Sequence, residues 1–279
     1  MFEFYLYRFR VHPSKQGELF AGEKSRPQIL REVLASLPAS EFKAGYVWHV
    51  GNVNPLDDNS LYFRIGRTTK STIEMYDRGN FIDAEFESAP YTHAVIDLSL
   101  EVCAIARKSR LTPKTKGTAN ALLKLLNEAE ITSSLHAKFE LGEINDPDDF
   151  ISYLNASYAV TKFWMTFSKP NAIDVEQDYT LPMERLLEES DGHEGKTELK
   201  GPNLKPNTLE KLARSAAAVG ENAGALLKMG PKDKPTRKVL TGNPAVVLHE
   251  DVAEYEDKRA LLENIRKLYS RIRKNDKIS

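Results

Sequence analysis

The sequence has one cysteine, Cys103, among its 279 residues. A lone cysteine cannot form a disulfide within the chain, and it cannot supply the cysteine pairs of a structural zinc or iron–sulfur site. The six histidines lie at least 37 residues apart and form no His-x-x-x-His pair. Their spacing therefore predicts no metal site and no cofactor. A reducing compartment suits such a chain, and we expect a cytoplasmic protein.

Long apolar runs are also absent. A helix that crosses a membrane needs about 18 consecutive apolar residues, whereas only 41% of this sequence is hydrophobic and its apolar stretches stay far shorter. Glu3, Arg8 and Arg10 interrupt the apolar N-terminal stretch, so we expect no signal peptide. These features predict that no membrane is a partner.

The sequence also has almost no net charge, because 39 Lys and Arg balance 40 Asp and Glu. The balance argues against a uniformly basic nucleic-acid protein. It hides an uneven distribution, however. Residues 1–138 carry 18 basic and 16 acidic residues, residues 139–199 carry 4 and 14, and residues 200–279 carry 17 and 10. An acidic middle and a basic end predict a polar partner or internal docking.

Residues 1–130 have the pattern of a β-rich α+β domain. The opening stretch, Phe2–Val11, alternates aromatic and polar residues at the period of a half-buried strand. Ser25-Arg26-Pro27 is a helix start, because Ser caps well and Pro suits the first turn. That helix should end near Leu37, and a second should run from about Thr118 to Glu130. Further strands are predicted over 46–50, 61–66, 81–88, 92–98 and 100–106.

Residues 131–250 show the element order β-α-β-β-α-β, which is typical of a ferredoxin-like domain. Its helices should begin after Asp146-Pro147 and at Pro206. Its strands are predicted over 135–142, 160–168, 196–201 and 223–229. An acidic insertion at about 170–195, with a short helix over 182–189, interrupts the domain.

The remaining sequence predicts two more elements. Thr241-Gly242-Asn243-Pro244 is a turn that should join strands 237–240 and 245–249 into a β-hairpin. Residues 251–279 should form a C-terminal amphipathic helix, with Leu261, Leu262 and Ile265 on its apolar face. The expected fold class is therefore α+β, with a β-rich domain, a ferredoxin-like domain, a β-hairpin and a terminal helix.

The densest run of positive charge, 107–116, holds five basic residues and no acidic one. It lies between a predicted strand and a predicted helix, where an exposed loop can contact phosphates. The same charges also suit a plain solvated connection. The candidate phosphate-binding residues here are Arg107, Lys108, Arg110, Lys114 and Lys116.

A second basic group, Arg64, Arg67 and Lys70, surrounds Gly66, where a ligand could approach the backbone closely. The segment lacks the Gly-Lys-Ser/Thr end of a P-loop, so nucleotide hydrolysis is not expected. The competing interpretation is that these three residues are solvent-facing side chains of an edge strand.

The third group is the basic end of the chain. It includes Arg237 and Lys238 on the expected hairpin and several bases of the last helix, among them Lys258 and Arg259. The Lys and Arg residues of that helix are equally consistent with the solvent-facing side of a helix that packs on the domain through its other face.

Five further positions bear on function. Cys103 lies in a predicted strand with an alternating pattern, and it should be a buried side chain rather than a reactive one. His49 and His93 should be core or edge residues, although either would be the economical base of a metal-independent ribonuclease. Lys162 and Trp164 share a strand face that could stack bases, but residues 196–201 lack the aromatic motif of an RNA-recognition module.

These patterns favour a non-catalytic nucleic-acid-binding or assembly protein. One alternative is a metal-independent endoribonuclease on tandem ferredoxin-like domains. Another is a protein-interaction subunit or homo-oligomer that associates through its C-terminal helix.

Overall fold

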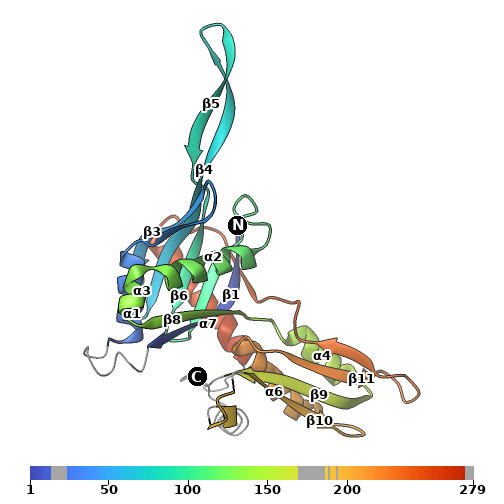
Figure 1. Cartoon of the computed structure of the whole chain (residues 1–279). Helices are drawn as coiled ribbons and strands as arrows, with labels where there is room; N and C mark the ends of the chain where they lie inside the picture. Colours follow the sequence, from blue (N-terminus) through green and yellow to red (C-terminus); the bar gives the residue numbers. More distant parts are fainter. Residues whose placement is uncertain (14–23, 169–185, 188, 193, 274–279) are drawn as a thin grey trace. The chain divides into compact units, whose positions relative to one another are not determined.

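A computed structural model describes residues 1–13, 24–168, 186–187, 189–192 and 194–273. The chain divides into two compact units, and neither is continuous in sequence. The first unit comprises Met1–Tyr5, Phe9–Leu141 and Leu248–Leu262, and the second comprises Leu6–Arg8, Gly142–Val247 and Glu263–Ser279. Helices are mixed with mostly antiparallel sheets, which confirms the α+β class (Figure 1). Across the described ranges, no helix combines the length and apolarity that a membrane crossing needs.

The larger sheet has the order β13-β1-β7-β6-β4-β3-β2, with β5 paired to β4 and β8 paired to β1. Its strands are β1 (Phe2–Pro13), β2 (Ala39–Lys43), β3 (Tyr46–Pro55), β4 (Ser60–Asp77), β5 (Asn80–Ser88), β6 (Tyr91–Asp97), β7 (Val102–Ala106), β8 (Ala137–Glu143) and β13 (Val246–His249).

The helices of the first unit include α1 (Arg26–Ala35), α2 (Thr115–Glu128) and α3 (Glu130–Ser134). The start of α1 is the one predicted: Ser25 and Gln28 form a capping box, which satisfies two backbone amides that the first turn leaves free. Leu30 of α1 and Leu122 of α2 are fully buried, and both helices contact β3.

Strand alternation divides the central strands β4 and β6 into two faces. Arg64 pairs with His93 and Phe63 with Ala94 in the antiparallel register, so directly paired side chains share a face and successive residues alternate. Phe63 and Ile65 are fully buried. The other face therefore carries Arg64 and His93.

Strand β4 extends well beyond the expected 61–66. Its second half pairs with β5 from Thr69↔Ser88 to Asp77↔Asn80, and the two strands project as a long hairpin (Figure 1).

The second unit contains a four-stranded antiparallel sheet with the order β10-β9-β11-β12. Its strands are β9 (Ala159–Ser168), β10 (Glu194–Lys200), β11 (Ala223–Lys228) and β12 (Thr236–Val239). The helices α4 (Asp148–Ala156) and α6 (Pro206–Ala218) contact this sheet. Phe163, Met165 and Ala225 are buried on one side of it.

The ferredoxin-like arrangement expected for residues 131–250 is not the one observed. That arrangement requires all four predicted strands in one sheet, whereas β8 pairs with β1 and only β9, β10 and β11 share the smaller sheet. Element order alone does not choose a pairing partner, because the half-buried pattern of β8 is satisfied by either sheet.

The expected hairpin of strands 237–240 and 245–249 is wrong. Strand β12 pairs with β11, and β13 belongs to the other sheet. The backbone shows why: the Leu240 N–H donates to the carbonyl of Ala223, whereas the Leu6 N–H donates to Ala245. The turn residue Gly242, at φ +107°, therefore lies between two separate pairings.

The C-terminal helix is confirmed as α7 (Tyr255–Arg273). Its predicted apolar residues Leu261, Leu262 and Ile265 are buried. In the second unit, buried Arg8 donates to the Tyr269 hydroxyl at 2.7 Å, and that hydroxyl donates to the carbonyl of Ala218 at 3.1 Å. Most of the acidic insertion lies outside the described residues, and of the short helix predicted over 182–189 only 186–187 and 189 are described, all three helical.

Candidate phosphate-binding site in the first unit

One cation from each of the three basic groups lies beside one of two tyrosine rings in the first unit. Arg64 Cζ lies 4.5 Å from the ring centroid of Tyr91, and Lys108 Nζ lies 4.9 Å from the same centroid. Lys258, in the first turns of α7, has its Nζ 5.0 Å from the ring centroid of Tyr62. We call these five residues the basic cluster. Segments far apart in the sequence therefore supply one concentration of positive charge.

The pairing of β4 with β6 places the aromatic part of the basic cluster. Arg64 is opposite His93 and Gly66 is opposite Tyr91, so the four residues lie on one face. A Cβ on Gly66 would lie only 2.7 Å from the Pro90 carbonyl oxygen and 2.8 Å from Tyr91 Cβ. The glycine thus permits the close approach of β6, which differs from the ligand contact expected for it.

The loop after β7 is fixed on both sides of Lys108. The Arg107 N–H donates to the Glu3 carbonyl at 2.8 Å, and the two side chains form an ion pair at 3.3 Å. On the other side, the N–H of buried Leu111 donates to the Lys108 carbonyl at 2.9 Å. Lys108 itself stays exposed. Its ammonium group is therefore presented from an anchored backbone.

His93 lies beneath the basic cluster. Its Nδ1 is 2.6 Å from the Tyr62 hydroxyl, and Arg64 Nε donates to that hydroxyl at 3.5 Å. The Tyr62 hydroxyl is therefore hydrogen-bonded to both His93 and Arg64. Burial, followed by the charges of Arg64, Lys108 and Lys258, lowers the pKa of His93 to about 4, although Asp251 opposes the shift. His93 is consequently neutral at pH 7 and adds no fourth positive charge.

The three cations are available for an anion. Among the residues that the structure describes, none of Arg64, Lys108 and Lys258 forms an ion pair with a carboxylate. By contrast, Arg26 pairs with Glu101 at 2.6 Å. Unpaired cations from different segments, together with an aromatic ring, can bind a phosphate through charge-assisted hydrogen bonds.

An open hollow of about 500 Å³ adjoins this region. Phe2 belongs to its lining and also contacts His93, with the ring centroids 4.9 Å apart. Its volume falls within the range of small-molecule sites, about 300–1,000 Å³. Its lining residues are Met1, Phe2, Glu3, Arg107, Ser109 and Leu248.

Arg67 does not join the basic cluster. It pairs with Trp48 across the sheet and lies on the face opposite Arg64, with its Cζ 4.8 Å from the Tyr46 ring centroid. Arg67 Nη2 donates to the Arg110 carbonyl at 3.5 Å. Arg67 is therefore placed to support the loop that follows β7.

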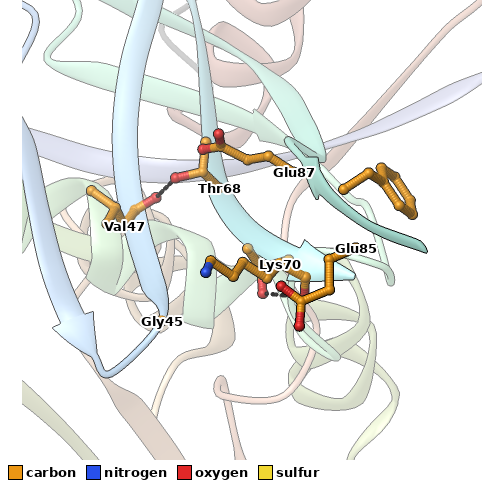
Figure 2. A pocket seen from close by; sticks show the side chains of 8 residues that line it. Gly45, Val47, Thr68, Lys70, Glu85 and Glu87 are labelled. Carbon is orange, nitrogen blue, oxygen red and sulfur yellow. Dashed lines mark hydrogen bonds between the residues drawn. The ribbon is translucent and has the colours of Figure 1, made fainter. Parts of the chain in front are cut away.

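Lys70 lies in a different environment, a hollow of about 380 Å³ where β4 pairs with β5 (Figure 2). It is opposite Glu87 in the register, and Glu85 also lines the hollow. One cation beside two carboxylates gives this hollow a negative balance, which disfavours a phosphate.

The other predicted residues are distributed elsewhere. Lys114 and Lys116 stand at the start of α2, with the Lys114 carbonyl accepting from Thr112 Oγ1 at 2.8 Å. Arg237 and Lys238 belong to β12 in the second unit and point to opposite faces. Arg237 Cζ lies 5.1 Å from the Trp164 ring centroid, and Lys238 Nζ lies 3.9 Å from that of Tyr153.

Sequence reasoning missed the aromatic partners Tyr62 and Tyr91, and it did not single out Lys258. A signal was present for the two tyrosines, because Tyr62 and Arg64, like Tyr91 and His93, are two residues apart in a strand and so share a face. No local pattern relates α7 to β4.

The sequence matches no protein-family model, and none of the curated proteins compared with it matches. In the described part of the chain, no group of three or more His, Cys, Asp or Glu side chains is arranged to hold a metal ion.

Proposed function

We propose that the chain binds nucleic acid and that the basic cluster contacts its phosphates. The observation that carries the proposal is the convergence of Arg64, Lys108 and Lys258 from three separate segments. Tyr91 is 38% exposed, and two of these cations lie 4.5 and 4.9 Å from its ring centroid. Positive groups beside an exposed aromatic ring match a ligand in which phosphates alternate with stackable bases.

Binding is favoured over cleavage by the surroundings of His93. A general base must reach the proton that it removes, but His93 is only 9% exposed and its Nδ1 is already hydrogen-bonded to Tyr62. Phe2 and Tyr91 meet its ring edge-on. His49 is also engaged, with its Nε2 2.9 Å from Thr68 Oγ1. These contacts support a structural role for both histidines.

The test compares two variants that lose the same charge. The first is Arg64→Gln/Lys108→Gln/Lys258→Gln. The matched control, Lys43→Gln/Arg78→Gln/Lys124→Gln, removes three cations from other parts of the first unit. Fluorescence anisotropy with labelled RNA and DNA measures affinity, and gel electrophoresis after incubation shows whether the RNA stays intact.

We expect the first variant to bind about 10- to 100-fold more weakly, because each lost phosphate contact removes a charge-assisted bond. The control should change affinity by less than about threefold. Equal losses in the two variants would contradict the proposed site. Metal-free cleavage that disappears in His93→Gln would instead support the endoribonuclease alternative.

A second function, as a protein-interaction subunit, is supported by the β4–β5 hairpin. Two-stranded hairpins are marginally stable in water on their own, and exposed apolar patches commonly mark interaction sites. Phe81 is 86% exposed and Tyr76 67% exposed, with ring centroids 5.1 Å apart. The other exposed apolar residues of the hairpin are Ile73, Met75, Ile82 and Phe86.

Analytical ultracentrifugation tests whether the hairpin associates with a second copy of the chain. Tyr76→Ser/Phe81→Ser should shift the sedimentation profile towards the monomer, whereas Tyr158→Ser, at a 59% exposed position of the second unit, should not. A wild-type chain that stays monomeric at every concentration would argue against self-association.

A further inference from the structure

The sheet of the second unit has an exposed face with a tryptophan at its centre. Strand β9 alternates, so Phe163 and Met165 are buried on one face and Trp164 lies on the other. Trp164 itself is only half-buried, and Lys196, Glu198 and Arg237, which border it, are exposed.

The indole of Trp164 is supported by the backbone of the neighbouring strand. Gly224 is directly opposite Trp164 in the β9–β11 pairing. A Cβ on Gly224 would lie 2.2 Å from Trp164 Cζ2 and 2.5 Å from Cε2. The ring therefore occupies the space that a side chain would fill. One side of the indole rests on the sheet, which leaves its other side directed outward.

Cations from three strands surround this ring. The distances to its centroid are 5.9 Å for Lys162 Nζ, 5.6 Å for Lys196 Nζ and 5.1 Å for Arg237 Cζ. Attraction between a cation and the indole face accounts for their positions. The positive side chains belong to β9, β10 and β12, so they border the ring on both sides along the sheet.

Two carboxylates of β10, Glu194 and Glu198, alternate onto this face, and Glu198, which is directly opposite Trp164, is already neutralised. Its oxygens lie 2.7 Å from Lys162 Nζ and 3.0 Å from Lys200 Nζ. Hydrogen bonds from these two lysines lower the pKa of Glu198 to about 2. Within the described residues, Lys196 and Arg237 have no carboxylate partner. They are therefore the cations that an incoming phosphate would meet.

We infer that this face binds single-stranded nucleic acid, with an unpaired base stacked on Trp164 and the adjoining phosphates held by Lys196 and Arg237. A duplex cannot present a base face to the ring, because its bases are stacked on each other. The inference rests on the proposed function for the class of ligand and adds a second contact, in the second unit. Exposed Lys and Arg side chains can swing aside from the ring to admit a base.

A purely structural role for Trp164 predicts different behaviour. An aromatic side chain opposite a glycine fills the gap in a sheet and stabilises it. In that case Trp164→Ala would lower stability without distinguishing one ligand from another. A stacking role requires instead that the loss of affinity depend on the presence of bases in the ligand.

The experiment therefore uses two single-stranded oligonucleotides of equal length and charge, one with bases and one abasic, each in an RNA and a DNA form. Trp164→Ala should weaken binding of the base-bearing strand about 5- to 100-fold and change binding of the abasic strand by less than twofold. Trp164→Phe should recover most of the affinity. Tyr153→Ala is the matched control, because Tyr153 also lies beside a cation but on α4.

A second pair of variants keeps the test valid if Trp164→Ala folds poorly. Lys196→Gln/Arg237→Gln alters exposed positions only and should weaken both oligonucleotides about 10-fold. The control Lys205→Gln/Lys211→Gln removes two exposed lysines at α6 and should leave both affinities within twofold of the wild type.

The outcomes separate this inference from the proposed function. Equal effects of Trp164→Ala on base-bearing and abasic strands, or equal effects of Trp164→Ala and Tyr153→Ala, would overturn the stacking site. If Trp164→Ala weakens base-bearing strands while Arg64→Gln/Lys108→Gln/Lys258→Gln binds normally, the stacking site stands and the basic cluster fails. A wild-type chain that binds neither strand would end both.

Discussion

The Tyr62 hydroxyl lies 2.6 Å from Nδ1 of His93, and it accepts a longer hydrogen bond from Arg64. This chain of contacts joins a buried histidine to the half-buried guanidinium at the edge of the basic cluster. The hydrogen bond to Tyr62 also raises the pKa of Arg64. Burial and the nearby cations keep His93 neutral, and the hydrogen bond to Tyr62 helps to keep Arg64 in position.

Removal of the Tyr62 hydroxyl should destabilise the first unit. Tyr62→Phe leaves Nδ1 of His93 without its hydrogen-bond partner at a site where Tyr62 is 1% exposed. An unsatisfied buried polar group costs about 1–3 kcal/mol, and we expect a decrease of that size in the free energy of unfolding measured with urea. Tyr158→Phe, at an exposed position, should change it by less than about 0.5 kcal/mol. A Tyr62→Phe variant as stable as wild type would contradict this reading of the pair.

Stability should fall as the pH decreases from about 6.5 to about 4. The pKa of His93 drops from 6.5 to about 4 in the folded chain, so in this window the unfolded chain binds a proton that the folded chain does not. The slope of the unfolding free energy against pH is therefore positive there, and stability is lost on acidification.

His93→Gln removes the titrating ring, so its unfolding free energy should depend less steeply on pH between 4 and 6.5 than that of wild type. Urea titrations at several pH values measure both slopes. Identical slopes in the two proteins would show that other groups cause the dependence.

Gly66 and Gly51 provide a matched pair for the packing of the sheet. A methyl group on Gly66 meets Pro90 and Tyr91 at less than 3 Å, whereas one on Gly51 meets nothing within 4 Å. Gly66→Ala should cost about 1–3 kcal/mol through overpacking and should displace Tyr91. Gly51→Ala should be neutral or slightly stabilising, because alanine suits a strand better than glycine. Thermal unfolding of both variants distinguishes them, and equal changes would refute the packing role of Gly66.

Local sequence signals located most secondary structure correctly where burial imposes a period. Phe2–Val11 and 160–168 alternate because one side of each strand is buried, and Ser25 marks the start of α1 through its capping box. The second half of β4 had no such signal. Its residues from Thr72 onward are all exposed, so the sequence there has no hydrophobic alternation tied to a core.

Strand partners and the candidate site depended on long-range contacts that local patterns do not encode. The half-buried pattern of β8 fits either sheet, and β13 follows a turn sequence that resembles a hairpin turn. Charge counting identified the segments that contain Arg64, Lys108 and Lys258. Their convergence depends on the β4–β6 register and on where α7 packs, which involve residues distant in sequence.

The salt dependence of binding to single-stranded RNA shows directly whether the basic cluster contacts phosphates. Each phosphate contact to a single strand adds about 0.7 to the slope of log affinity against log salt concentration. Loss of three contacts in Arg64→Gln/Lys108→Gln/Lys258→Gln should make the slope shallower by about 2 between roughly 50 and 200 mM salt. Lys43→Gln/Arg78→Gln/Lys124→Gln should retain the wild-type slope. A cluster variant whose slope equals that of wild type would show that these three cations do not contact phosphates.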